Sequence, residues 1–172
     1  MKNPIAFFPQ AEYRISVGSL GGIPLFYDVN GYQSFISRVN DSFCDDFLIL
    51  AYVLLPNQCH FIVRTRALTS QETIREFSSQ LRRNIYGNLQ FYGHDDSPLR
   101  PIVLPIPQEG FERVRILRNS ILHFHSLPVK MGLISTPEDW PYSSCHWIQN
   151  GGQIHPLSKW LNDFLLRYPD VF

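Results

Sequence analysis

Residues 48–66 read LILAYVLLPNQCHFIVRTR, and this stretch decides the fold. An apolar run, a Pro-Asn break and a second run rich in β-branched and aromatic residues predict two adjoining strands. Because successive side chains of a strand point to opposite faces, Gln58 and His60 share one face and Cys59 points to the other. Two polar side chains held on a rigid strand form a candidate metal or proton-transfer site.

The chain on either side of this strand pair alternates between strand and helix patterns. The further strand-like segments are 11–17, 23–27 and 102–106, and the helical periodicities cover 30–43, 70–86, 111–124 and 156–168. Asn30 is expected to cap the first helix, and Pro128 to lie beyond the end of the third. Prolines around 102–106 predict an edge strand, and 137–147 predict an ordered aromatic loop.

This order of elements is typical of an α+β fold. We expect a ferredoxin-like antiparallel sheet with helices packed on one face. A chain of 172 residues most simply forms one domain, 1–172, with a C-terminal extension from about 152.

Composition indicates a folded, cytosolic protein. Hydrophobic residues make up 44% of the chain and aromatic residues 14%, which excludes a disordered chain. Neither a run of roughly 18 apolar residues nor a secretory leader is seen, so we expect a cytoplasmic protein without a membrane partner. Cys44, Cys59 and Cys145 are widely spaced without a CxxC pair, which speaks against a disulfide framework and a zinc site.

Charge is unevenly distributed along the chain. The net charge is zero, yet residues 64–130 hold ten Lys and Arg against six Asp and Glu. Such an excess is typical either of a solvated charged face or of a surface that binds phosphates, and the sequence leaves both open.

Three stretches carry patterns that occur in series in one known family. Residues 51–66, AYVLLPNQCHFIVRTR, match an apolar run followed by Met-Pro-Asn and His-hydrophobe-His. Residues 123–134, HFHSLPVKMGLI, match a segment usually reading Tyr-Ile-His-x-Asn-Pro-Val-Lys-Ala-Gly-Leu-Val, and residues 137–146, PEDWPYSSCH, match Pro-Glu-Asp-Tyr-Pro-Trp-Ser-Ser-Tyr. The chain therefore resembles the REP-associated tyrosine transposases, HUH-type enzymes of the insertion-sequence-200-like group, from about residue 12 to residue 151.

The resemblance implies metal-dependent cutting and rejoining of single-stranded DNA. In that chemistry two histidines and a polar helix residue hold a divalent metal, and a helix tyrosine attacks phosphorus. Carried over by position, the first histidine falls on Gln58 and the second on His60. The tyrosine falls on His123 and the helix ligand, an Asn in the family, on Leu127, which cannot bind a metal.

Two interpretations of these altered positions stay open. Gln58 and His60 could form a weak two-ligand site for Mg²⁺ or Mn²⁺, with His123 as nucleophile, or they could be a hydrogen-bonded polar remnant. No cofactor is expected otherwise. The sequence His123-Phe124-His125 repeats the metal motif, but on a helix residues two apart lie about 200° apart and cannot share a metal.

The remaining histidines and tyrosines are expected to have structural roles. We expect solvent-exposed or capping roles for His94, His125, His146 and His155. Packing aromatics are expected at Tyr52, Tyr86, Tyr92 and Tyr142.

The leading hypothesis is a DNA-binding protein that has lost strand cleavage. The resemblance implies a hairpin with flanking single strand as ligand, bound by a monomer or homodimer. The candidate phosphate-binding residues are Arg64, Arg66, Arg82, Arg83, Arg113, Arg115, Arg118 and Lys130. The alternatives are an active single-strand transposase with a rebuilt site and a protein-interaction remnant that no longer binds DNA.

Overall fold

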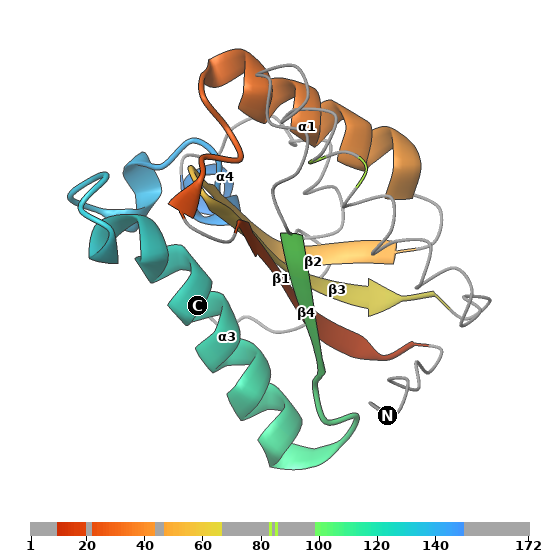
Figure 1. The fold of residues 1–172 in the computed structure, drawn as a ribbon. Coiled ribbons are helices and arrows are strands. Elements are labelled where there is room, and N and C mark those ends of the chain that lie inside the picture. Colours follow the sequence, from red (N-terminus) through yellow and green to blue (C-terminus); the bar gives the residue numbers. More distant parts are fainter. Residues whose placement is uncertain are drawn as a thin grey trace.

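The computed structural model describes residues 10–19, 22–43, 47–66, 83, 85 and 99–149. Its elements are β1 (Glu12–Ser19), α1 (Val29–Phe43), β2 (Phe47–Leu55), β3 (Gln58–Thr65), β4 (Leu99–Pro105), α3 (Gly110–Lys130), the 3₁₀ turn η2 (Pro137–Asp139) and α4 (Ser144–Gln149). The strands form one antiparallel sheet in the order β2-β3-β1-β4 (Figure 1). The α+β class and the antiparallel sheet are confirmed, in the strand order of a ferredoxin-like fold.

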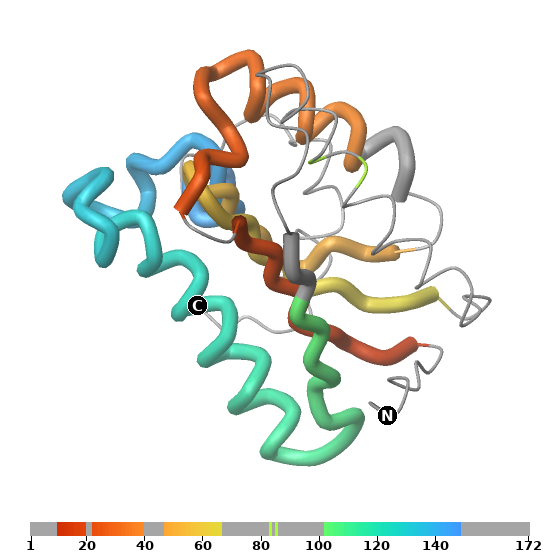
Figure 2. Tube along the Cα trace, viewed as in Figure 1, coloured from red at the N-terminus to blue at the C-terminus, as the bar shows by residue number. Residues whose placement is uncertain are grey.

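The helices cover both faces of the sheet, whereas the sequence predicted helices on one face. Figures 1 and 2 show α1 on one side of the sheet and α3 on the other. Phe35 and Val39 of α1 pack with Ile15 and Phe61 in one buried cluster, while α3 packs against a second cluster that includes Ile62. The physical reason is that β2 and β3 are apolar on both faces, so each face needs a covering layer.

Strand β4 lies at the edge of the sheet, as predicted, and its prolines match that place. The Ile106 N–H donates to the Glu12 carbonyl oxygen at 2.9 Å. By the register of the two strands, Leu104 and Ile102 also direct their backbone polar groups toward β1. In an antiparallel pair the alternate residues direct their backbone polar groups to the other side. Pro101 and Pro105 therefore stand where a backbone N–H would face away from the sheet.

Three local predictions were wrong. Asp28, rather than Asn30, caps α1, because its Oδ1 accepts the Gly31 N–H at 2.8 Å. Residues 23–27 do not form a strand but a loop. Helix α3 continues through Pro128 to Lys130. The helix tolerates the proline because only its last turn follows, and backbone N–H groups beyond the helix donate hydrogen bonds to carbonyl groups of that last turn.

Other predictions lie outside the described residues. The predicted helix 70–86 is described only at Arg83 and Ile85, which are both helical. The described residues do not include the predicted helix 156–168 or the C-terminal extension. They also do not include Cys44, Arg82, Tyr86, Tyr92, His94 and His155. No helix within the described ranges is long and apolar enough to cross a membrane.

Candidate functional site

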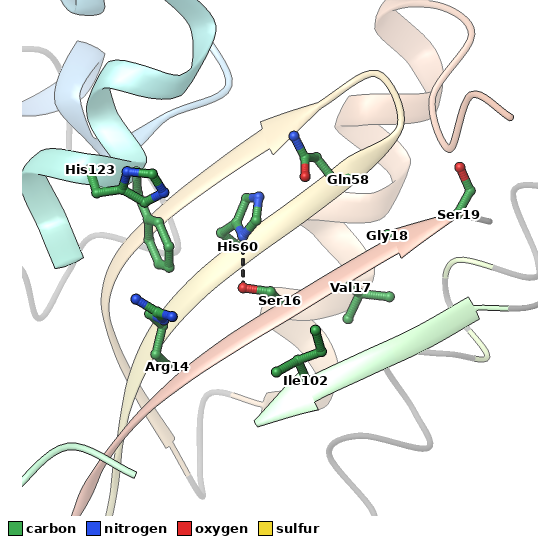
Figure 3. A pocket seen from close by; sticks show the side chains of 10 residues that line it. Arg14, Ser16, Val17, Gly18, Ser19, Gln58, His60, Ile102 and His123 are labelled. Atoms are coloured by element: carbon green, nitrogen blue, oxygen red, sulfur yellow. Dashed lines mark hydrogen bonds between the residues drawn. The ribbon is translucent and has the colours of Figure 1, made fainter. Parts of the chain in front are cut away.

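A pocket of about 470 Å³ opens on the side of the sheet that α3 covers. Strand β1 brings Arg14 and Ser16 to its wall, β3 brings Gln58 and His60, and α3 brings His123 (Figure 3). Register explains the assembly, since Ser16 stands opposite His60 on the neighbouring strand. Gln58 and His60 therefore share one face, as predicted, while Cys59 is fully buried in the cluster on the α1 side.

His60 forms the floor of the pocket as a neutral imidazole. Its Nδ1 lies 2.8 Å from Ser16 Oγ, and its ring lies 4.9 Å from the ring of Phe124 between centroids. Burial first, and then the nearby charges of His123 and Arg14, together lower the pKa of His60 to about 4. Its Nε2 is buried and has no hydrogen-bond partner among the described residues.

His123 stands where the resemblance places the tyrosine nucleophile. It projects from α3 and lines the same pocket as His60 (Figure 3). Partial burial lowers its pKa below the ordinary value, and the charges of Lys130 and Arg14 act in the same direction. The structure thus brings His60 and His123 together, but it offers an imidazole where strand cleavage in the family uses a phenol.

The position of the helix ligand contributes nothing to the pocket. Leu127 is half-buried and packs against the core cluster beneath α3. The Gln58 amide nitrogen points to Met131 Sδ at 3.6 Å.

The residues around His60 do not fit a site for Mg²⁺ or Mn²⁺. The described part of the chain holds no group of three or more His, Cys, Asp or Glu that could bind a metal ion. The lining residues that the structure describes offer two imidazoles and one amide oxygen but no carboxylate, and these hard cations prefer carboxylate oxygens.

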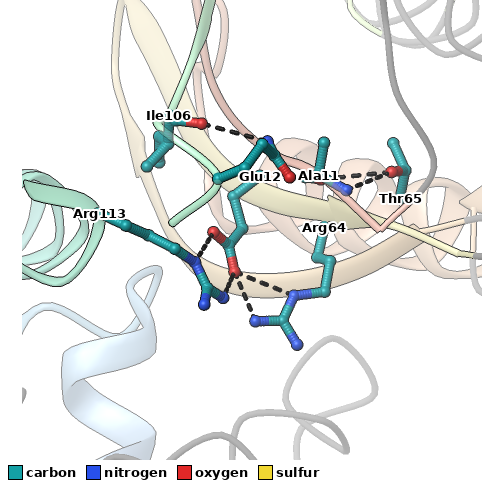
Figure 4. A network of polar contacts seen from close by, with 7 residues as sticks. Ala11, Glu12, Arg64, Thr65, Ile106 and Arg113 are labelled. Carbon is teal, nitrogen blue, oxygen red and sulfur yellow. Dashed lines mark hydrogen bonds and ion pairs between the residues drawn. The ribbon is translucent and has the colours of Figure 1, made fainter. Parts of the chain in front are cut away.

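Two of the candidate DNA-binding arginines form ion pairs with an internal carboxylate. Glu12 is 1% exposed, and Figure 4 shows both Arg64 and Arg113 directed at it. Arg113 Nε donates to Glu12 Oε2 at 2.7 Å, and Arg64 Nε donates to Oε1 at 3.0 Å. Burial alone would raise the pKa of Glu12, but the hydrogen bonds from Arg113 and then Arg64 outweigh it and lower the pKa.

The other candidate cations that the structure describes are not among the lining residues of the pocket. Arg115 pairs with Glu112 one turn earlier on α3, where both side chains are exposed. Arg118 and Lys130 are exposed on the same helix, Arg83 is exposed and Arg66 is half-buried. Which of these residues bind phosphate stays a prediction.

The cation of the pocket is Arg14, which sequence reasoning missed. Its position two residues before Ser16 on a strand was a usable signal, because it places both side chains on one face. Its closeness to His60 and His123, however, follows only from the pairing of β1 with β3 and the path of α3.

His125 is buried, whereas an exposed or capping role was expected. It is 5% exposed, and its Nε2 hydrogen bonds to Ser144 Oγ at 2.8 Å. The prediction that His123 and His125 face opposite sides of the helix is confirmed, since only His123 lines the pocket. His146 lies on α4, in the segment 137–147 that was predicted to be a loop, and its Nδ1 hydrogen bonds to the Glu138 carbonyl oxygen at 2.6 Å.

The predicted packing role of two tyrosines is confirmed. Tyr52 is buried in the core on the α1 side. Tyr142 stacks on Tyr32 with ring centroids 3.9 Å apart. Trp140 Nε1 donates to the Leu54 carbonyl oxygen at 2.7 Å, so the aromatic loop is fixed to β2.

Comparison with solved structures identifies the fold as that of a transposase. The chain is similar to the REP-associated tyrosine transposase solved with a REP hairpin bound, with a TM-score of 0.66 and 19% identity over 90% of both chains. It also matches a candidate transposase from Deinococcus radiodurans R1, with a TM-score of 0.41 and 15% identity over 69% of this chain and 95% of that one. No protein-family model and no curated protein matches the sequence.

Proposed function

We propose that this chain is a divergent member of the REP-associated tyrosine transposase family that binds hairpin DNA but does not cleave it. The shared fold with a hairpin-bound transposase supports the DNA-binding half of this proposal. The observation that carries the other half is that His123 lines the pocket at the tyrosine position, while Leu127 packs against the core cluster and does not line the pocket.

The exposed side of α3 is the surface we assign to DNA backbone. Arg118 and Lys130 are exposed there, and Arg14 lies in the adjoining pocket. Arg64 and Arg113 belong to the fold rather than to this surface, because both guanidiniums are directed at the buried Glu12 carboxylate. Backbone phosphates are the groups that such arginine and lysine side chains bind without regard to sequence.

The test is a labelled DNA hairpin with a single-stranded flank, incubated with the full chain and Mn²⁺. We expect a shifted band on a native gel that weakens steeply with salt, and an intact oligonucleotide on a denaturing gel. A covalent protein–DNA adduct that His123→Ala abolishes would establish the active-transposase alternative instead. A native gel that stays blank at low salt would contradict DNA binding and favour a protein-interaction role.

A further inference from the structure

The ionisable side chains described in the pocket lining are all basic. Among the residues that the structure describes, its lining includes Arg14, His60 and His123 but no Asp or Glu. A divalent cation would find no carboxylate there, whereas an anion would meet a guanidinium and two imidazoles. The donor set therefore suits a negatively charged group.

Arg14 differs from Arg64, Arg113 and Arg115 in having no acidic partner among the residues that the structure describes. Arg64, Arg113 and Arg115 each pair with a carboxylate. Within the described ranges no Asp or Glu forms an ion pair with Arg14, although its side chain is half-buried. A cation withdrawn from water without a counter-charge is costly, so the pocket is short of one negative charge.

His60 supplies a second donor that lacks a partner. Ser16 Oγ can donate to Nδ1 across 2.8 Å, and the neutral ring then carries its proton on Nε2. That nitrogen is buried and meets no hydrogen-bond acceptor in the part of the chain described. A buried N–H in this state gains most from a ligand oxygen.

We propose that this pocket binds a phosphate group without a metal ion, through Arg14 as the cation and His60 and His123 as hydrogen-bond partners. As a site for the DNA backbone the inference rests on the proposed function, but as a phosphate site it can be tested without DNA. Arg14 would supply the positive charge that a divalent ion supplies in a metal-dependent site.

The experiment titrates inorganic phosphate into the full chain in EDTA, with chloride matching the ionic strength, and follows the histidine imidazole resonances by NMR. We expect saturable shifts at His60 and His123 with a Kd on the order of 1 mM. Arg14→Gln should weaken binding about tenfold or more, and Arg14→Lys should retain most of it. Arg38→Gln, on α1 across the sheet, is the matched control and should bind phosphate like the wild type.

Equal shifts with phosphate and chloride, binding that needs Mn²⁺, or full affinity in a folded Arg14→Gln variant would each overturn the inference. Dimethyl phosphate as a second probe separates a backbone diester from free phosphate, since the better-bound probe identifies the source. Phosphate binding with a blank hairpin gel would uphold the pocket and refute the proposed function. Hairpin binding without phosphate binding would do the reverse.

Discussion

The carboxylate of Glu12 lies between two guanidiniums at the point where β1, β3 and α3 meet. Removing a buried carboxylate leaves Arg64 and Arg113 without the group that they surround (Figure 4). We expect Glu12→Gln to lower the free energy of unfolding by about 3 kcal/mol, measured by urea denaturation at pH 7. Glu112→Gln, which removes an exposed pair, is the control and should cause no measurable change. A tolerated Glu12→Gln would show that the network is not structural.

His125 makes stability depend on mild acid. Burial lowers its pKa to about 4, so the unfolded chain takes up a proton near pH 6.5 while the folded chain does not. Stability is therefore complete above pH 6.5 and is lost progressively as pH falls toward 4. The share of His125 between pH 7 and pH 5 is roughly 2 kcal/mol.

The check compares urea denaturation of the wild type and His125→Gln at both pH values. The variant should lose less stability between pH 7 and pH 5 than the wild type does. The remaining loss belongs largely to His60, whose pKa is lowered in the same direction. An identical pH dependence in both proteins would contradict the assigned role of His125.

For single residues, the sequence predicted the features that follow from the alternation of side chains along a strand. It missed the features that depend on which distant segments pack together. Gln58 and His60 share a face because of local geometry, which the sequence states directly. Arg14, Glu12 and the burial of His125 depend on which strand or helix lies opposite, and these partners are distant in the chain: 101 residues separate Glu12 from Arg113, and 19 separate His125 from Ser144. A single sequence carries no direct signal for such distances.

The exposed side of α3 is the element that we expect to contact DNA. We expect the double variant Arg118→Ala and Lys130→Ala to weaken hairpin binding about tenfold and to lower the slope of log affinity against log salt by about 2. The measurement is a gel-shift titration at several salt concentrations. Arg38→Ala on α1 is the control for the loss of a positive charge elsewhere. An unchanged salt slope in the double variant would remove α3 from the interface.

Element types were predicted well, and their ends and partners less well. Helix α1 and strands β1 to β4 follow from periodicity, because a buried face repeats every two or about 3.6 residues. The length of α3 did not follow, since Pro128 is buried in its last turn and packing there outweighs the lost hydrogen bond. The covering of both faces also required knowing where α3 crosses the sheet.

At the scale of the whole molecule, the two edge strands of the sheet, β2 and β4, differ in what their outward backbone groups meet. Along β2 the loop after η2 continues the pairing, since the Leu54 N–H donates to the Tyr142 carbonyl oxygen at 2.9 Å and Val53 bridges to Ser143. Along β4 the outward positions are Pro101 and Pro105, with Val103 between them. Each edge thus carries a local feature that hinders pairing with a further strand.

Replacing the two prolines tests the role of the β4 edge. The double variant Pro101→Thr and Pro105→Thr adds two outward N–H groups to a strand that remains compatible with threonine. We expect it to associate at concentrations where the wild type gives an unchanged mass, measured by analytical ultracentrifugation. Gln33→Thr, at an exposed site on α1, is the control. Equal sedimentation of all three proteins would show that the prolines have no part in keeping copies apart.

The prolines of β4 also bear on how readily copies of this protein aggregate. An edge strand that holds prolines at outward positions is a poor template for adding strands from other copies. Crowded or newly synthesised molecules should therefore be less prone to one common route to amyloid. Assembly of this protein would then depend more on contacts between side chains, which ordinary mutation can tune or abolish.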